Sequence, residues 1–279
     1  MVLNLTPSHP LSLPRISIIT SVRNGKRFVE QTIKSVIGQH YDNIEYIVID
    51  GGSTDGTVDI IRSHESGIAK WVSEKDGGIA EAFNKGFLFS TGDYVLFLNA
   101  DDALANPGVI ACAAQAIVDK NFPALLYGDC DVLDRESGRI LYRASIEIAR
   151  KELLRGRMIP QPSLFTHRFY FEKYGVFDPH FKIAMDYEWL LRGGLAEQIV
   201  HVPLLMTNVR NGGISTLDRS RVVNEIISAL KKNGYVSSGW AELKMRGHYA
   251  LRSLVRSVLE GIGLYEVFLD LRSKQKKQN

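Results

Sequence analysis

YVLFLNADD, residues 94–102, carries the clearest structural signal in this chain. Its first five residues are apolar and rich in aromatic and branched side chains, which predicts a strand buried on both faces of a sheet. Asn99 and the adjacent carboxylates of Asp101 and Asp102 follow at once. A bound cation would offset the repulsion between these carboxylates, although Asp is also common at turns such as the one before Pro107.

The chain upstream repeats the change from a short apolar strand to a polar strand end. Strands are expected at residues 16–21, 41–50 and 69–72, and the helical spacing of apolar residues predicts helices at 28–37 and 79–89. Strands that alternate with helices at this spacing form βαβ units. The sequence therefore predicts an α/β fold with a mostly parallel sheet flanked by helices.

Polar residues gather at the carboxyl ends of the expected strands, where open parallel sheets bind ligands. In chain order they are Thr20, Asn24, Asp50, Asp76, Asn99, Asp101 and Asp102. Each has a structural alternative: Thr20 ends a strand, Asp50 caps a helix and Asp76 makes an Asx turn. Four successive polar strand ends favour a ligand site over turn chemistry alone.

Standard nucleotide motifs do not account for these strand ends. The glycines of GGSTDG, residues 51–56, lack the G-x-G-x-x-G spacing, and Thr20 stands where a Walker loop ending at Lys26 needs its first glycine. Carboxylates approach a diphosphate only through a bridging cation. Asp101 is therefore expected to bind Mg²⁺ or Mn²⁺.

Four motifs together resemble the nucleotide-sugar half of family 2 glycosyltransferases, which are inverting enzymes with the GT-A fold. They are ISIITSVRN (16–24), IEYIVIDGGSTDGT (44–57), SEKDGGIAEAFNKG (73–86) and YVLFLNADD (94–102). The resemblance covers residues 15–210. It implies a Rossmann-like, mostly parallel mixed sheet, and a transferase of the kind that assembles bacterial surface polysaccharides such as exopolysaccharide or O-antigen.

The resemblance assigns roles to single residues. It implies that the nucleotide-sugar is bound by Thr20, Asn24, Asp50, Asp76, Asn99 and Asp101. Asp101 is the implied ligand of Mn²⁺ or Mg²⁺. Asn99 stands where the family usually has Asp, and an amide there can still hydrogen-bond a ribose hydroxyl. Uracil is the implied base, with guanine and thymine open.

The second half of the chain must supply a base, because inverting transfer removes a proton from the acceptor hydroxyl. MDYEWLLR, residues 185–192, resembles the family's ED-x-x-L-x-x-R segment, with Met185 in place of Glu. Asp186 at the start of this helix is the expected general base, since a helix N-terminus favours an ionised carboxylate. Asp186 could also act only as a helix cap. Glu188 is a rival, but it points away from Asp186.

Other residues are assigned to the acceptor side or left open. Residues 158–168 resemble the acceptor-lining segment, where Gln161 is the expected polar contact, and Asp102 is placed on the same side. Arg192 could pair with a carboxylate or approach a phosphate. His201 is expected to be an ordinary strand histidine. The acceptor itself is expected to be a glycan or a polyprenyl-linked molecule.

The expected organisation is a leader (1–14), a catalytic domain (15–216) and a helical extension (217–279). The domain divides into a donor half (15–102) and an acceptor half (103–216). The extension is basic and amphipathic, so it either packs on the domain or lies on a membrane surface. No run of about 18 apolar residues is present, and the two cysteines have no paired spacing. A cytoplasmic protein, with a peripheral position at the inner membrane face as the alternative, is expected.

The net charge and the motifs bear on three other functions. A net charge of +3 is too small to indicate nucleic-acid binding. A sugar-phosphate nucleotidyltransferase would open with a glycine-rich segment, and TSVRNGK, residues 20–26, has too few glycines. A nucleotide-sugar-binding module without catalysis would keep Asp50 and Asp101 and could dispense with Asp186.

Overall fold

The structure is a computed structural model of the 279-residue chain. It describes residues 13–145, 147–148, 150–193, 196–213 and 218–237, and residues 239, 242–243, 246–247 and 249. The expected leader up to residue 12 lies outside the described residues. Residues 250–279, which carry most of the expected amphipathic helix, lie outside them as well.

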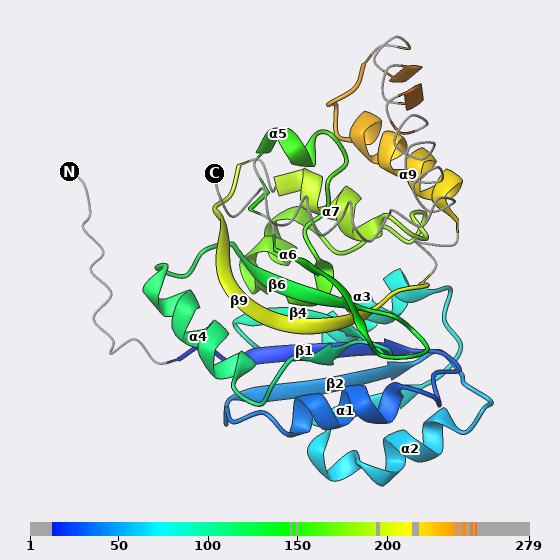
Figure 1. Cartoon of the computed structure of the whole chain (residues 1–279), viewed down its shortest axis with the longest axis vertical. Coiled ribbons are helices and arrows are strands. Elements are labelled where there is room, and N and C mark those ends of the chain that lie inside the picture. The colour runs from blue at the N-terminus through cyan, green and yellow to red at the C-terminus, as the bar shows by residue number, and fades with distance from the viewer. Residues whose placement is uncertain are drawn as a thin grey trace.

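Across the described residues, nine strands form one mixed sheet in the order β3-β2-β1-β4-β8-β6-β9-β5, with β7 paired to β6 (Figure 1). The strands are β1 (Ile16–Val22), β2 (Ile44–Asp50), β3 (Lys70–Ser73), β4 (Tyr94–Asn99), β5 (Ala103–Leu104), β6 (Leu125–Leu133), β7 (Ile140–Ala144), β8 (Leu164–His167) and β9 (Ile199–Arg210). Strands β1 to β4 pair in parallel, and β8 runs antiparallel between β4 and β6. The predicted α/β fold with a mixed sheet is confirmed, and among the described residues four strand pairings are parallel and four are antiparallel.

Helices cover both faces of this sheet (Figure 1). They are α1 (Val29–Ile37), α2 (Thr57–Ser63), α3 (Ile79–Phe89), α4 (Val109–Asp119), α5 (Arg150–Leu153), α6 (Arg168–Tyr174), α7 (Met185–Gly193) and α9 (Arg219–Lys232), with 3₁₀ turns η1 (Glu65–Gly67) and η2 (Gln161–Ser163). One buried cluster joins α3, α6, α7 and α9, and the other joins α1 and α4. None of the described helices is long and apolar enough to cross a membrane.

Strand β4 shows why the core has two layers. Val95 and Phe97 belong to one buried cluster, whereas Tyr94, Leu96 and Leu98 belong to the other. Successive side chains of a strand point to opposite faces, so a continuous apolar run can fill both layers. Each such side chain contributes roughly 1.5–3 kcal/mol when it is fully buried. The strand end that carries the polar residues is therefore held rigidly.

Strand β9 runs through Pro203, whereas the sequence of residues 198–210 predicts one or two strands interrupted by this proline. The strand is continuous, but its register against β6 shifts next to Asp129. Gly128 lies in this irregular stretch, and a Cβ atom added there would come within 2.5 Å of the Leu204 carbonyl oxygen. Proline has no N–H to donate to a sheet, and a bulge is a place where it is tolerated. The irregular pairing thus accommodates Pro203 without ending β9.

Two further segments of the acceptor half can be compared with the sequence. The turn signal Glu136-Ser137-Gly138 predicts a hairpin within residues 129–145, and the structure confirms it: β6 and β7 pair antiparallel around Gly138, whose φ is +69°. Residues 158–168 show no regular pattern in the sequence and predict an irregular segment, but they form η2, β8 and the start of α6. β8 is four residues long and gains its hydrogen bonds from β4 and β6, so a local pattern gives little sign of it.

Candidate active site

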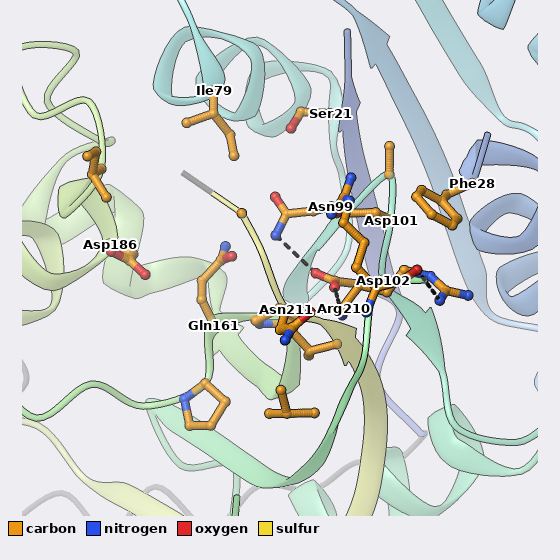
Figure 2. Close-up of a pocket in the computed structure, with 18 of the residues that line it drawn as sticks. Ser21, Phe28, Ile79, Asn99, Asp101, Asp102, Gln161, Asp186, Arg210 and Asn211 are labelled. Carbon is orange, nitrogen blue, oxygen red and sulfur yellow. Dashed lines mark hydrogen bonds and ion pairs between the residues drawn. The ribbon is translucent and has the colours of Figure 1, made fainter. Parts of the chain in front are cut away.

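A cleft of about 1200 Å³ lies beyond the carboxyl ends of β1 and β4. Its walls come from the loops after these strands, the β6–β7 hairpin, η2, the start of α7 and the end of β9. Figure 2 shows Asn99, Asp101 and Asp102 on one side of it and Asp186 on the other, with Gln161 between them. The structure therefore brings the predicted metal ligand and the predicted base to one cleft.

Asp101 lies in the cleft wall beside a basic cluster. Its Oδ2 accepts a hydrogen bond of 2.7 Å from Nη1 of Arg135 on the β6–β7 hairpin, and its side chain is 28% exposed. The Arg135 guanidinium also lies 5.1 Å from the centre of the Phe28 ring. Arg27 and Arg210 contact the same ring, at 4.7 and 4.5 Å. Three guanidinium groups thus meet next to the predicted metal ligand.

Asp102 points away from Asp101 and lies on the floor of the cleft. It is 2% exposed, and its carboxylate accepts hydrogen bonds from Asn99 Nδ2 at 3.0 Å and from the Arg210 N–H at 3.3 Å. Burial, and to a lesser extent the charge of Asp101, raises the pKa of Asp102 to about 7. Asp102 therefore joins the end of β4 to the end of β9. The sequence predicts Asp102 on the acceptor side, and these contacts give it a supporting role in the cleft.

Asn99 ends β4, and its side-chain amide uses its nitrogen but not its oxygen in a hydrogen bond with the described residues. Its Nδ2 donates to Asp102, whereas its buried Oδ1 has no partner among the described residues. A buried acceptor without a donor is unfavourable, so it is satisfied when a donor binds beside it. A hydroxyl group, such as that of a ribose, is a suitable donor.

Thr20 and Asp50 are placed outside the cleft walls. Thr20 is fully buried within β1, and its hydroxyl accepts a hydrogen bond of 3.1 Å from Tyr46. Asp50 is fully buried as well. Its carboxylate accepts from the N–H groups of Gly52 and Ser53 at 3.1 and 2.9 Å, and from the hydroxyls of Ser53 and Ser73. In this structure both residues hold loops and strands together, and neither reaches the cleft.

Asn24 and Asp76 do line the cleft. Asn24 adopts a φ of +51°, and its Oδ1 accepts from the Thr54 N–H at 2.9 Å, which ties the loop after β1 to the loop after β2. Asp76 makes the expected Asx turn, since its Oδ1 accepts a hydrogen bond of 3.1 Å from the Gly78 N–H. A Cβ atom on Gly51 would come within 2.8 Å of Asp76 Oδ2, so only glycine leaves room for this carboxylate.

Asp186 begins α7 and faces the cleft from the acceptor side. It is partly exposed, and its Oδ1 accepts a hydrogen bond of 2.8 Å from the Tyr187 N–H. Burial raises the pKa of Asp186 to about 6, the hydrogen bond from Tyr187 opposes this, and the charge of Glu225 adds to it. A carboxylate with a pKa close to neutrality is suited to accept a proton.

Glu188 and Arg192 make their contacts on the side of α7 that faces away from the cleft. Glu188 is fully buried and forms ion pairs with Arg192 and with Lys232, the latter at 3.0 Å. Arg192 also donates to the carbonyl oxygens of Tyr174 and Val176, so it pairs with a carboxylate and does not line the cleft. Asp186 is therefore the carboxylate of α7 that faces the cleft.

Gln161 and His201 differ in whether their side chains have a hydrogen-bond partner among the described residues. Gln161 lies in η2 on the cleft wall, and its buried Nε2 has no partner in the part of the chain that the structure describes. His201 lies within β9, as expected, and its Nε2 is 2.8 Å from Asp129 Oδ1. Gln161 retains an unused donor at the cleft, whereas His201 pairs within the sheet.

The basic residues at the cleft were not predicted from the sequence. Arg135 reaches Asp101 from the β6–β7 hairpin, and the Arg210 N–H at the end of β9 reaches Asp102. Lys182 donates from the loop before α7 to the Gly77 carbonyl oxygen at 3.2 Å. Lysine and arginine in loops are usually solvated. A recognisable signal would have required knowing that β6 and β9 lie beyond β4 in the sheet.

The donor groups at the cleft fit a cation that is held mainly by substrate oxygens. Among the described residues, no group of three or more His, Cys, Asp or Glu side chains gathers into a metal-binding cluster. Mg²⁺ is commonly bound by one or two carboxylates together with substrate phosphates. The ion pair with Arg135 shows that the partly exposed Asp101 carboxylate accommodates a positive charge. Asp101 could therefore hold a divalent cation together with substrate oxygens.

Comparisons with known proteins show which sequences this chain resembles. Residues 17–175 match the family model described as glycosyl transferase family 2. An uncharacterized glycosyltransferase of Mycobacterium tuberculosis is 34% identical over 207 residues, which cover 74% of this chain and 78% of that protein. A PGL/p-HBAD biosynthesis glycosyltransferase of Mycobacterium bovis is 28% identical over 212 residues, covering 74% of this chain and 80% of that protein.

Solved structures share the fold. Residues 1–349 of TarS from S. aureus, in complex with UDP-GlcNAc, align with a TM-score of 0.63 at 15% identity, covering 85% of this chain and 71% of that one. The mannosyltransferase PcManGT from Pyrobaculum calidifontis, in complex with GDP-Man and Mn²⁺, aligns with a TM-score of 0.62 at 19% identity, covering 86% and 70%. This chain spans 43% of a longer TarS chain. At these identities the likeness shows the fold alone.

Proposed function

Because this chain belongs to glycosyl transferase family 2, and is thus a glycosyltransferase, we propose that it transfers a sugar with inversion from a nucleotide-sugar to a glycan or lipid-linked acceptor. The observation that carries the proposal is that one cleft contains both Asp101 and Asp186. The first carboxylate suits a cation on a diphosphate, and the second suits proton removal. A donor site and a base in one cleft are what inverting transfer requires.

The donor is proposed to be a nucleoside diphosphate-sugar, most simply a UDP-sugar. Structural neighbours are in complex with UDP, UDP-GlcNAc and GDP-Man, which supports this class of ligand without choosing the base. Asn24, Asp76, Asn99 and Asp101 are the cleft residues proposed to bind it. Thr20 and Asp50 would act from behind, by fixing the strand ends on which the donor lies.

Asp186 is proposed to accept the proton of the acceptor hydroxyl. The hydroxyl oxygen forms a bond to the anomeric carbon, the bond from that carbon to the diphosphate breaks, and the proton passes to the Asp186 carboxylate. A bound Mn²⁺ or Mg²⁺ would stabilise the charge of the departing diphosphate. Arg135 and Arg210, beside Asp101 and Asp102, place further positive charge on the same side of the cleft.

The acceptor is proposed to be a glycan or a polyprenyl-linked molecule in surface polysaccharide synthesis. Peripheral contact with the inner membrane face would come from the basic C-terminal region, most of which lies outside the described residues. A chain that ends at about residue 240 tests this contact. Its release from sedimented membranes would support the proposal, whereas undiminished sedimentation would exclude the C-terminal region as the anchor.

A thermal-shift screen tests the donor. The full chain is heated with UDP-, GDP- and dTDP-sugars, each with and without Mn²⁺. We expect one nucleotide class to raise the Tm, and to do so more strongly with Mn²⁺, because a ligand that binds only the folded state stabilises it. Release of pyrophosphate from a nucleoside triphosphate and a sugar phosphate would instead show a nucleotidyltransferase. Donor binding without transfer to any acceptor would show a binding module.

A further inference from the structure

We infer that Gln161 is a positioning residue for Asp186, and that it acts through one ordered water held in a small cavity behind the Asp186 carboxylate. The inference rests on the proposed role of Asp186 as the base. Gln161 would donate to the water, and the water would donate to the carboxylate. Both side chains line the main cleft as well, so the bridge would lie at the edge of the reaction site.

The cavity has the size and chemistry for a single water. Its volume is about 10 Å³, the lower limit at which one water molecule fits. Its walls include the apolar side chains of Phe97, Phe177 and Trp189 and the polar side chains of Gln161, Thr166 and Asp186. Buried waters are held by two to four polar groups, whereas cavities without polar groups stay dry. Three polar residues line this water-sized cavity, and one of them, Gln161, has a buried donor without a partner among the described residues, which favours an occupied site.

Gln161 supplies an unused donor that cannot easily turn away. Its Nε2 is buried and has no partner among the described residues. Pro160 and Pro162 flank it, and their rings restrict the backbone of η2, which is closed by a hydrogen bond of 3.0 Å from the Ser163 N–H to the Pro160 carbonyl oxygen. Buried donors in folded proteins are paired with protein or water. Water is the partner that the cavity can hold.

Asp186 has a reason to need such a partner. The Tyr187 N–H binds its Oδ1, and this contact comes from the same helix turn. The charged groups on the neighbouring elements are Glu225 of α9, whose charge disfavours the ionised form, and Lys182, whose Nζ is engaged with the Gly77 carbonyl oxygen. A donor on the cavity side would favour the ionised form and fix the orientation of the carboxylate toward the cleft.

The replacement Gln161→Met tests the inference in the full chain. Methionine has nearly the same length and is apolar, so it removes the donor and keeps the packing. The rate at saturating substrate is measured against pH. We expect the acidic limb of the profile to move upward by about one pH unit, because a lost hydrogen bond makes the carboxylate easier to protonate. The KM for the acceptor should stay within about twofold.

Gln115→Met on α4 is the matched control. Gln115 is exposed and donates to Asp119 at 2.8 Å, away from the cleft, so its pH profile should match that of the native chain. A Gln161→Met chain whose acceptor KM rises more than tenfold with an unmoved acidic limb would overturn the inference. Gln161 would then be an acceptor contact.

A crystal structure of the full chain without substrates gives a second readout that does not depend on turnover. We expect a water within hydrogen-bond distance of both Gln161 Nε2 and the Asp186 carboxylate, and its loss in Gln161→Met. A dry cavity in the native chain would overturn the inference. Failure of the proposed function has a different signature, namely no sugar transfer by the native chain while this water is present.

Discussion

The ends of β2 and β4 both carry carboxylates, but the structure uses them in opposite ways. At the end of β2, the fully buried Asp50 carboxylate is saturated by donors from its own loop and from Ser73. At the end of β4, Asn99 Oδ1 has no partner among the described residues, and Asp101 is held by an arginine from another part of the chain. Both strands are neighbours of β1 in the same sheet.

The difference teaches where ligand chemistry is to be expected. A polar group that is satisfied by its own loop stabilises the fold, and a ligand would have to displace existing hydrogen bonds to reach it. A group that is left unsatisfied, or is held in place by a distant charge, gains when a ligand arrives. This criterion agrees with the proposed reaction site at the end of β4 and the start of α7, and with a supporting role for β2. Four sets of substitutions test this division, and those expected to reduce turnover most come first.

Asp186→Asn should have the largest effect. An amide of the same shape cannot accept the proton, so turnover should fall by about 10³-fold, within the usual range for a general base. Donor affinity, measured by calorimetry, should be unchanged. The acidic limb of the native pH profile, expected near the pKa of about 6, should disappear from the residual rate. A parallel loss of donor affinity would show that Asp186 binds the donor and would contradict its proposed role as the base.

Asp101→Asn should reduce turnover by about 10²-fold, because it weakens the hold on the cation that bridges to the diphosphate. The increase in Tm that Mn²⁺ adds to nucleotide binding should be lost with it. Asp119→Asn, an exposed change on α4, serves as the control. Sugar transfer at full speed in excess chelator would contradict the role given to the end of β4.

Asp50→Ala should act on stability first. It leaves the donors of Gly52, Ser53 and Ser73 without their acceptor in a buried position, so the free energy of unfolding should fall by about 3 kcal/mol. Asp76→Ala, at a partly exposed position, should cost less than about 1 kcal/mol. Both are measured by urea unfolding. If Asp50→Ala keeps its stability and loses donor affinity, the end of β2 belongs to the ligand site.

Arg135→Gln should have the smallest effect, and it should increase an affinity where the other changes reduce turnover or stability. It frees the partly exposed Asp101 carboxylate, so the affinity for Mn²⁺ in the absence of nucleotide should rise by about three- to tenfold. Electron paramagnetic resonance of free Mn²⁺ measures this directly. Arg62 on α2 pairs with its helix neighbour Asp59, away from the cleft, so Arg62→Gln should leave the Mn²⁺ affinity unchanged. Equal Mn²⁺ affinity in both variants would show that Arg135 does not compete for Asp101.

Local patterns predicted the elements that carry the site. The continuous apolar run before Asn99 and the turn at Gly138 are encoded by neighbouring residues, because side-chain direction and φ depend on local sequence. The position of Asp186 at the start of a helix was predicted for the same reason. In contrast, β8 was missed, since four residues acquire strand geometry only from the neighbours that pair with them.

The cluster around Asp101 shows what local patterns cannot supply. Arg135 is 34 positions away in sequence from Asp101, and the N–H of Arg210 is 108 positions away from the Asp102 carboxylate it binds. These contacts exist because β8, β6 and β9 follow β4 in the sheet order. Nothing in the residues around Arg135 distinguishes it from an ordinary solvated arginine.

The alternating strands and helices and the polar residues at their ends follow from the sequence alone, because burial and turn formation act over a few neighbouring residues. Which of those polar residues face the cleft follows from the tertiary structure. Asp50 is saturated mainly by its own loop, whereas Asp101 is paired with Arg135, which the order of the strands brings beside it. Hydrogen-bond satisfaction is a property of the assembled fold.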